Sequence, residues 1–212
     1  MIEQPPTQPL NEAETPAPSE LLAADEPATQ PPAPSEADSV DGGDTWVSRL
    51  IEAARTGTEL DLTSLGGSRD PAEADQWPAE RTVPAAAIRT ALLTRDLNAD
   101  PHGLRLHGAH ITGQLDFENA TIPCELALGL CTFAQPILMN SSHLPALTLT
   151  GSHTPGLDLD QATIKGVVDL RHITTTGEIS ATGVTIGQLV MTGATLTKET
   201  GVALNLAGAT VD

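Results

Sequence analysis

Residues 104–113 read LRLHGAHITG, and the same pattern of apolar residues recurs down to residue 211. Each half-unit is apolar-x-apolar, and two polar or glycine residues follow it. Because alternate residues of an extended chain share a face, both apolar residues point to one side and the middle residue points to the other. Ten units follow one another at a spacing of mostly ten or eleven residues. The sequence therefore predicts a repeat fold made of short strands.

Two units are needed for one coil of the predicted solenoid. A single unit gives two short sides and encloses too little space for a core, whereas two units give four sides and about 21 residues per coil. The first stacked column is Leu104, Leu126, Leu147, Val168 and Leu189, and the second is Leu115, Ile137, Leu157, Ile179 and Leu204. The last step of the second column is longer, because residues 197–200 are expected to form a loop inserted at one corner. About five coils at roughly 4.8 Å per coil would form a rod roughly 25 Å long.

The five-residue steps resemble those of the pentapeptide-repeat proteins, as in GAHIT (108–112), NATIP (119–123), QATIK (161–165) and GATVD (208–212). In that family a small residue stands two places before a central leucine or phenylalanine. The resemblance implies small inward residues at Ala109, Ala120, Cys131, Ser142, Ser152, Ala162, Ala194 and Ala209. It implies central residues at Ile111, Ile122, Phe133, Leu144, Ile164, Ile186, Leu196 and Val211. Half of the steps have leucine where the pattern has alanine, and a spacer makes eleven residues, so a flattened or looser coil is favoured over a square one.

We therefore expect a mainly β protein whose residues 101–212 form a right-handed quadrilateral parallel β-helix. Residues 45–100 are expected to form a small N-terminal helical cap, and residues 1–44 a disordered tail. The tail holds ten acidic residues, no basic residue and nine of the 17 prolines, so it buries too little apolar surface to offset the entropy of ordering. Such a tail is a solubilising leader or, alternatively, a lure for a basic partner.

A first helix is predicted from the apolar face made by Trp46, Leu50 and Ala54 at i, i+4 and i+8. Asp44 is expected to cap this helix and Gly57 to end it.

A second helix is expected to start near Pro84, because its fixed φ suits the first helical position. Residues Ala87, Ile88, Ala91 and Leu92 supply the apolar face of that helix. A short strand is predicted between the two helices at residues 60–62.

The segment WPAERTV (77–83), followed by a helix and by GLRL (103–106), resembles the start of a group of long bacterial repeat proteins. Proteins of that group are often called oxidoreductases or membrane-associated oxidoreductases, which implies redox activity. The sequence has no G-x-G-x-x-G motif that opens a helix after a strand, so it carries no dinucleotide-binding fingerprint.

The six histidines lie in or beside the repeats. His110 and His153 occupy one outward column with Thr132 between them, so they are expected roughly 10 Å apart, too far for one metal ion. His143 is expected on the opposite side. No partner is predicted for His102, His107 and His172. No catalytic, cofactor-binding or metal-binding residue is therefore assigned.

Cys131 falls at an inward position and is expected to be an inert buried thiol, and Cys124 falls at a corner. The gap of seven residues between them matches no zinc spacing. Outward carboxylates are expected at Asp116, Asp158, Asp160, Asp169 and Glu178, where they would form a solvated face. Outward threonines form two columns, which are Thr121, Thr163, Thr185 and Thr210, and Thr132, Thr174 and Thr195. Most rungs have one such threonine, which disfavours an ice-binding array.

The composition bounds the possible partners. A net charge of −18 and 2% aromatic residues exclude a basic, aromatic platform for direct binding of nucleic acid. No stretch of about 18 apolar residues encodes a membrane span. The first five residues lack the basic and apolar segments of a secretory signal, so a cytoplasmic location is expected, with peripheral membrane association left open.

The favoured function is that of a non-catalytic scaffold or protein-interaction module. Its expected contact is a protein partner or a second copy, bound through the uncapped C-terminal coil, because such a coil leaves backbone and apolar edges unpaired. The alternative is an oxidoreductase, as the second resemblance implies. A minor alternative is a DNA mimic that binds a topoisomerase, which some pentapeptide-repeat proteins are, although the net charge of −5 in residues 101–212 is modest.

Overall fold

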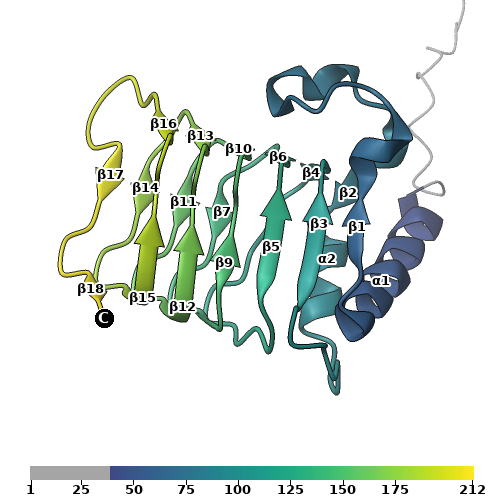
Figure 1. The fold of residues 1–212 in the computed structure, drawn as a ribbon, viewed down its shortest axis with the longest axis horizontal. Coiled ribbons are helices and arrows are strands. Elements are labelled where there is room, and N and C mark those ends of the chain that lie inside the picture. The colour runs from purple at the N-terminus through teal and green to yellow at the C-terminus, as the bar shows by residue number, and fades with distance from the viewer. Residues whose placement is uncertain (1–38) are drawn as a thin grey trace, which may run out of the picture. The chain divides into compact units, whose positions relative to one another are not determined.

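The structure is a computed structural model that describes residues 39–212, with side chains described from residue 44 onward. These residues form a mainly β, parallel β-solenoid of about five turns with about 22 residues per turn, as Figure 1 shows from the side. The predicted disordered tail lies outside the described residues up to residue 38.

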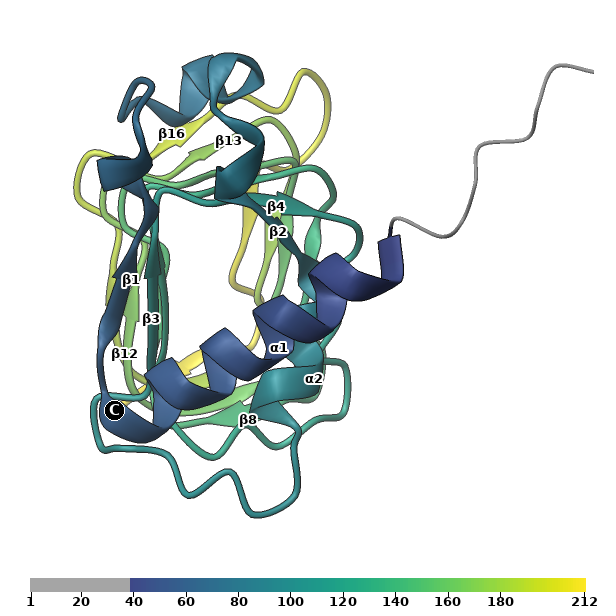
Figure 2. The ribbon, with the colours of Figure 1, turned by 90° about the vertical axis from the view of Figure 1, so that its right-hand side faces the viewer.

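Four faces make up each turn (Figure 2). Every strand pairing between successive turns is parallel. The first face contains β1 (Glu59–Asp61), β3 (Leu104–His107), β5 (Leu126–Gly129), β9 (Leu147–Thr148) and the later residues of β12 (Thr163–Asp169) and β15 (Thr185–Val190). The second contains β2 (Thr82–Pro84), β4 (His110–Thr112), β6 (Thr132–Phe133), β10 (His153–Thr154), β13 (Thr174–Thr175) and β16 (Thr195–Leu196). The third contains β7 (Ile137–Leu138), β11 (Leu157–Asp158), β14 (Ile179–Ser180) and β17 (Leu204–Asn205). The fourth contains β8 (His143–Leu144), the first residues of β12 and β15, and β18 (Thr210–Val211).

The strand register confirms both predicted columns. Leu104, Leu126, Leu147, Val168 and Leu189 are consecutive partners on the first face. Ile137, Leu157, Ile179 and Leu204 are consecutive partners on the third face, and the bridge between Asp116 and Leu138 places Leu115 beside Ile137. Alternation explains the core: Leu104 and Leu106 are fully buried, while Arg105 between them is half-buried on the outside.

A residue with positive φ precedes the small inward position in every half-turn. Glycine occupies this place at Gly108, Gly151, Gly183, Gly193 and Gly208, and other residues occupy it at Asn119, Leu130, Ser141, Gln161 and His172. The left-handed conformation turns the chain at this corner, and it favours glycine because a Cβ atom crowds the backbone there. This corner conformation recurs with the repeat, mostly every ten or eleven residues.

Two helices lie at the N-terminal end of the solenoid (Figure 2). Helix α1 (Ser39–Thr56) packs its buried residues Trp46, Leu50 and Ala54 against helix α2 (Ala85–Leu92) and against β3. The predicted apolar face of α2 is confirmed, because its four residues Ala87, Ile88, Ala91 and Leu92 are buried. Both helices share one hydrophobic core with the solenoid.

Three predictions about this end need correction. Asp44 does not cap the first helix, because α1 begins at Ser39 and Asp44 lies inside it. Residues 39–44, expected in the tail, are therefore helical. Pro84 is the residue before α2 rather than its first helical residue, because it also ends strand β2. The short strand predicted at residues 60–62 is confirmed as β1, one residue earlier, and Gly57 follows α1 with a φ of +65°.

A buried arginine ties the segment before α2 to the solenoid. This segment holds three 3-10 helices, η1 (Leu62–Leu65), η2 (Pro71–Gln76) and η3 (Ala79–Arg81). Arg81 is fully buried, and its Nε donates to the carbonyl oxygen of Gly108 at 2.7 Å. Its Nη1 donates to the carbonyl oxygens of Ser68 at 2.7 Å and Gly66 at 3.1 Å, and its guanidinium stacks on Trp77. Arg81 therefore joins two loop carbonyls to a corner of the first turn.

The predicted corner loop near residues 197–200 is also confirmed. β16 ends at Leu196 and β17 begins at Leu204, with no regular secondary structure between them. In this loop the Nζ atom of Lys198 lies 2.6 Å from a carboxylate oxygen of Glu178 on the previous turn. The extra residues leave the register of β17 intact, because Leu204 still pairs with Ile179.

Candidate interaction surfaces

The histidines are separated on the surface, as the register predicted. Thr132 is the partner of both His110 and His153, so those two histidines lie two turns apart, and His143 pairs with Thr163 on another face. Within residues 39–212, no three His, Cys, Asp or Glu side chains are grouped closely enough to hold a metal ion.

Two histidines have carboxylate partners that the repeat pattern did not predict. The Nδ1 atom of His102 lies 2.7 Å from Asp100, and that of His107 lies 3.3 Å from Glu59. Glu59 lies on β1 and Asp100 precedes the first repeat, so the repeat pattern could not predict either contact.

Both cysteines are buried free thiols. Burial raises the pKa of Cys131 to about 12, and it also raises the pKa of Cys124. Since the thiolate is the reactive form, burial disfavours the reactive form of both side chains. The predicted burial of Cys131 at an inward position is confirmed.

Two outward carboxylates make hydrogen bonds within the solenoid. The Oδ1 atom of Asp160 accepts from the hydroxyl of Ser180 at 2.6 Å and from the backbone N–H of Thr182 at 2.7 Å, and both donors belong to the next turn. Asp158 accepts from the backbone N–H of Asp160 at 2.9 Å. The bonds to Asp160 join adjacent turns, and the bond to Asp158 lies within one turn.

Asp169 departs from the prediction of a solvated carboxylate. Its residue is buried, and Arg171 folds back over it with Nη2 to Oδ2 at 2.6 Å and Nε to Oδ1 at 3.0 Å. Hydrogen bonds from Arg171 lower the pKa of Asp169. The guanidinium itself stays half-exposed. The alternating pattern predicts the outward direction of Asp169, but not the side chain that covers it.

The last turn, residues 189–211, differs from the inner turns in exposure. Val202, Leu206 and Val211 are 54%, 40% and 56% exposed, whereas Leu147 and Leu149 of an inner turn are fully buried. The inward residues of the last turn are half-buried, namely Leu189, Met191, Ala194, Leu196, Leu204 and Ala209. The prediction that Val211 is a buried central residue is therefore wrong, because no described residue covers that side of β18.

Backbone edges are also unpaired on the last turn. β16 and β17 each end their sheet, β18 pairs only with β15, and the Leu189–Val190 part of β15 has a strand partner only in β12, among residues 39–212. Each edge presents N–H and C=O groups that another strand could pair with. Residues 189–212 contain three charged residues, which are Lys198, Glu199 and Asp212. Lys198 already pairs with Glu178. Apolar side chains and strand edges together make this turn a candidate contact surface, which we call the end face.

Comparison of the chain with protein-family models, with curated proteins and with solved structures gives no match. The parallel solenoid is consistent with the resemblance to pentapeptide-repeat proteins at the level of the fold. No helix within residues 39–212 has the length and apolar character needed to cross a bilayer.

Proposed function

We propose that this protein is a non-catalytic β-solenoid scaffold that binds a second protein chain through its end face, and that a second copy fills this role in the purified protein. The observation that carries the proposal is the end face itself, with unpaired strand edges beside Val202, Leu206 and Val211. Strand edges that stay open are sites for pairing with another chain. Apolar side chains gain about 25 cal/mol for each Å² that such pairing removes from water.

The size of the end face suits a specific interface. Residues 189–211 are 23 residues, and a stable protein interface uses about 20–30 residues on each side. The end face carries few charges, although the whole chain has a net charge of −18. Two acidic copies can therefore meet here with less repulsion than at other surfaces.

The opposite end of the solenoid favours a closed pair over a filament. Helices α1 and α2 lie over that end, so the end face of one copy cannot continue the coil of the next in a head-to-tail stack (Figure 2). Two end faces related by a two-fold axis would pair their strands antiparallel and use up both surfaces. The proposed assembly is thus a dimer.

We also propose that the repeats are of the pentapeptide type. Support comes from the positive-φ residue that precedes each small inward residue, as at Gly108 before Ala109 and Gln161 before Ala162. This arrangement places one such corner in every second five-residue step and leaves the side chain of the middle residue on the outer surface.

Light scattering of the full chain and of edge variants tests the proposal. Leu206→Lys and Val211→Lys each place a charge on the end face, which is how natural strand edges avoid pairing. We expect twice the chain mass of 22.0 kDa for the wild type and the mass of one chain for either variant. Leu65→Lys is the matched control, because Leu65 is 49% exposed but lies in η1, away from the end face. A monomeric wild type, or a dimer that both lysine variants retain, would contradict the proposal.

A further inference from the structure

A second unpaired strand edge lies at the N-terminal end of the solenoid. β1 pairs with β3 on one side, and no other strand within residues 39–212 pairs with it. The N–H of Leu104 donates to the carbonyl oxygen of Glu125 on the next turn. Neighbouring residues of a strand direct their backbone groups to opposite edges, so the backbone groups of Leu104 and Leu106 both face β5. In a parallel pair only one of two partner residues directs its groups at the other strand, so Leu60, the partner of Leu106, faces β3. The backbone groups of Glu59 and Asp61 therefore face away from β3, and the carbonyl oxygen of Asp61 accepts there from the hydroxyl of Ser64 at 2.9 Å.

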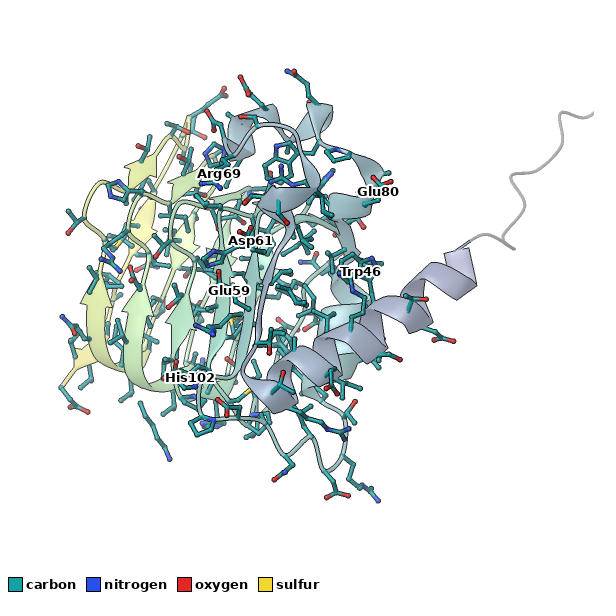
Figure 3. All side chains as sticks on the ribbon, turned by 45° about the vertical axis from the view of Figure 1, so that its right-hand side comes forward. Trp46, Glu59, Asp61, Arg69, Glu80 and His102 are labelled. Carbon is teal, nitrogen blue, oxygen red and sulfur yellow. The ribbon has the colours of Figure 1, made fainter. Side chains whose placement is uncertain are left out.

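A groove lies between this edge and helix α1. The two elements meet at Gly57 and diverge from it, which Figure 3 shows with Glu59 and Asp61 on β1 and Trp46 on α1. The groove has a volume of about 490 Å³ and is lined by Ser48, Arg49, Glu52, Ala53, Thr56, Thr58 and Leu60. Gly57 is required at this junction, because its φ is +65° and a Cβ atom there would lie 2.7 Å from the side-chain carbon Cγ of Asp100.

The groove offers different surfaces to the two faces of an extended chain. Ala53 is buried and Leu60 is half-buried, so they form an apolar floor on the inner side. Glu59 and Asp61 are exposed on the outer side of β1, one residue either side of Leu60. Side chains on adjacent strands that share a face are close neighbours, so residues of an added strand would meet these carboxylates on one face and the apolar floor on the other.

We propose that the edge of β1 and the flanking side of α1 form a binding site for an extended basic peptide, which adds to the sheet as one further strand. A strand edge beside a helix is a known geometry of peptide recognition, in which main-chain hydrogen bonds supply affinity and alternate side chains supply specificity. This site lies at the opposite end of the solenoid from the end face, so the inference stands apart from the proposed dimer.

The charge of the groove selects the basic class of peptide. Glu52 lines the groove, and Glu59 and Asp61 flank it on β1, where Asp61 also accepts hydrogen bonds from Thr63. These three carboxylates outnumber the guanidiniums of Arg49 and Arg105. The Arg49 guanidinium is stacked on the ring of Trp46 at 4.1 Å. Glu59 shares its carboxylate with Arg105 at 3.7 Å and His107 at 3.3 Å, and its side chain stays 37% exposed. The net charge of −18 adds a long-range attraction for cationic segments.

The required peptide pattern follows from these two faces. Basic residues at alternate positions would lie beside Glu59 and Asp61, and small apolar residues between them would lie over Ala53 and Leu60. Lysine and valine in alternation meet both conditions, and valine also favours the extended conformation. Proline in place of valine keeps the charge but removes the N–H groups that a strand needs.

Fluorescence anisotropy with labelled seven-residue peptides tests the site on the full chain. We expect a peptide of alternating lysine and valine to bind. A peptide of alternating lysine and proline should bind at least about tenfold more weakly, as the loss of one or two net hydrogen bonds would give. A peptide of alternating glutamate and valine should also bind at least about tenfold more weakly, because its carboxylates would face those of Glu59 and Asp61. Equal binding of the lysine–proline peptide would overturn the proposal, because charge alone would then explain the attraction.

Two variants locate the binding at the groove. Glu59→Pro removes an N–H that faces away from β3, so the solenoid pairing survives while the edge is blocked. Ser48→Trp fills the groove from the exposed side of α1. We expect each variant to weaken binding of the lysine–valine peptide by about tenfold, and Glu59→Gln to weaken it by only about threefold, because it keeps the N–H and loses one exposed charge.

Controls separate this result from misfolding and from self-association. Leu65→Trp places the same side chain outside the groove and should bind the peptide as the wild type does. Circular dichroism and thermal unfolding check the fold of Glu59→Pro. If Glu59→Pro is unfolded, binding to Ser48→Trp tests the site instead. Unchanged affinity in Ser48→Trp would refute the site. If Glu59→Pro has half the solution mass of the wild type, the proposed peptide site is also refuted, since a second copy of the chain would then occupy the groove.

Discussion

The corner residues carry the strain of this fold. Ten positions adopt positive φ immediately before the small inward position of a half-turn, and five of them are not glycine. At such a position a residue with a Cβ atom costs roughly 1–2 kcal/mol relative to glycine. The glycines were visible in the sequence, but the same conformation at Leu130 or Gln161 was not, because neither residue type signals a left-handed turn.

A pair of alanine substitutions separates conformational strain from steric clash. In Gly183→Ala, the new Cβ atom would lie 3.9 Å from the Gln161 side chain, so only the φ of +65° opposes it and we expect a loss of about 1 kcal/mol in unfolding free energy. In Gly103→Ala, the Cβ atom would also overlap the backbone of Glu125, so a loss of at least about 3 kcal/mol is expected. Urea unfolding measures both, and equal losses would show that the clash at Glu125 is relieved without cost.

The Asp169–Arg171 pair predicts a pH-dependent contribution to stability. Because hydrogen bonds from Arg171 lower the pKa of Asp169 in the folded chain, the pair stabilises the fold above the unfolded pKa and loses this effect as the pH falls through the folded pKa. We therefore expect Asp169→Asn to lower the urea midpoint at pH 7 and to leave it unchanged near pH 2. A midpoint that falls equally at both pH values would mean that packing, rather than charge, explains the effect.

Among the elements, the strands of the solenoid were the most predictable. Both predicted columns from Leu104 and Leu115 hold because a one-residue slip would turn every apolar side chain outward. β2 was missed because Thr82–Pro84 is short, contains proline and lies outside the repeats. The start of α1 was missed because residues 39–44 have the polar composition of the preceding tail. The groove beside β1 had no sequence signal, since it depends on the angle between two elements.

The segment before α2 depends on Arg81. We expect Arg81→Met to lower the unfolding free energy by about 2–4 kcal/mol, because it leaves the carbonyl of Gly108 and two loop carbonyls without their buried donor. Arg81→Lys should recover little of this loss, since an ammonium group lacks the planar fork that reaches separate acceptors. Urea unfolding gives the energies, and limited proteolysis within residues 62–81 reports loosening of the segment. Wild-type stability in Arg81→Lys would show that one point charge suffices.

At the scale of the whole molecule, the two ends of the solenoid differ. Helices α1 and α2 share the core at one end, whereas the last turn leaves Leu206 and Val211 exposed at the other. The inner turns are paired on both sides, so their amide groups should be protected without any partner. The end face should gain equal protection only when another chain pairs with it.

Amide hydrogen exchange of the full chain over a range of protein concentrations tests the end face most directly. Peptides from residues 126–170 should exchange slowly at every concentration, because their strands are paired within the chain. Peptides from residues 189–211 should exchange slowly at high concentration and rapidly on dilution, as the dimer dissociates. Exchange in residues 189–211 that is the same at all concentrations would contradict the assignment of the end face as an interface between two copies.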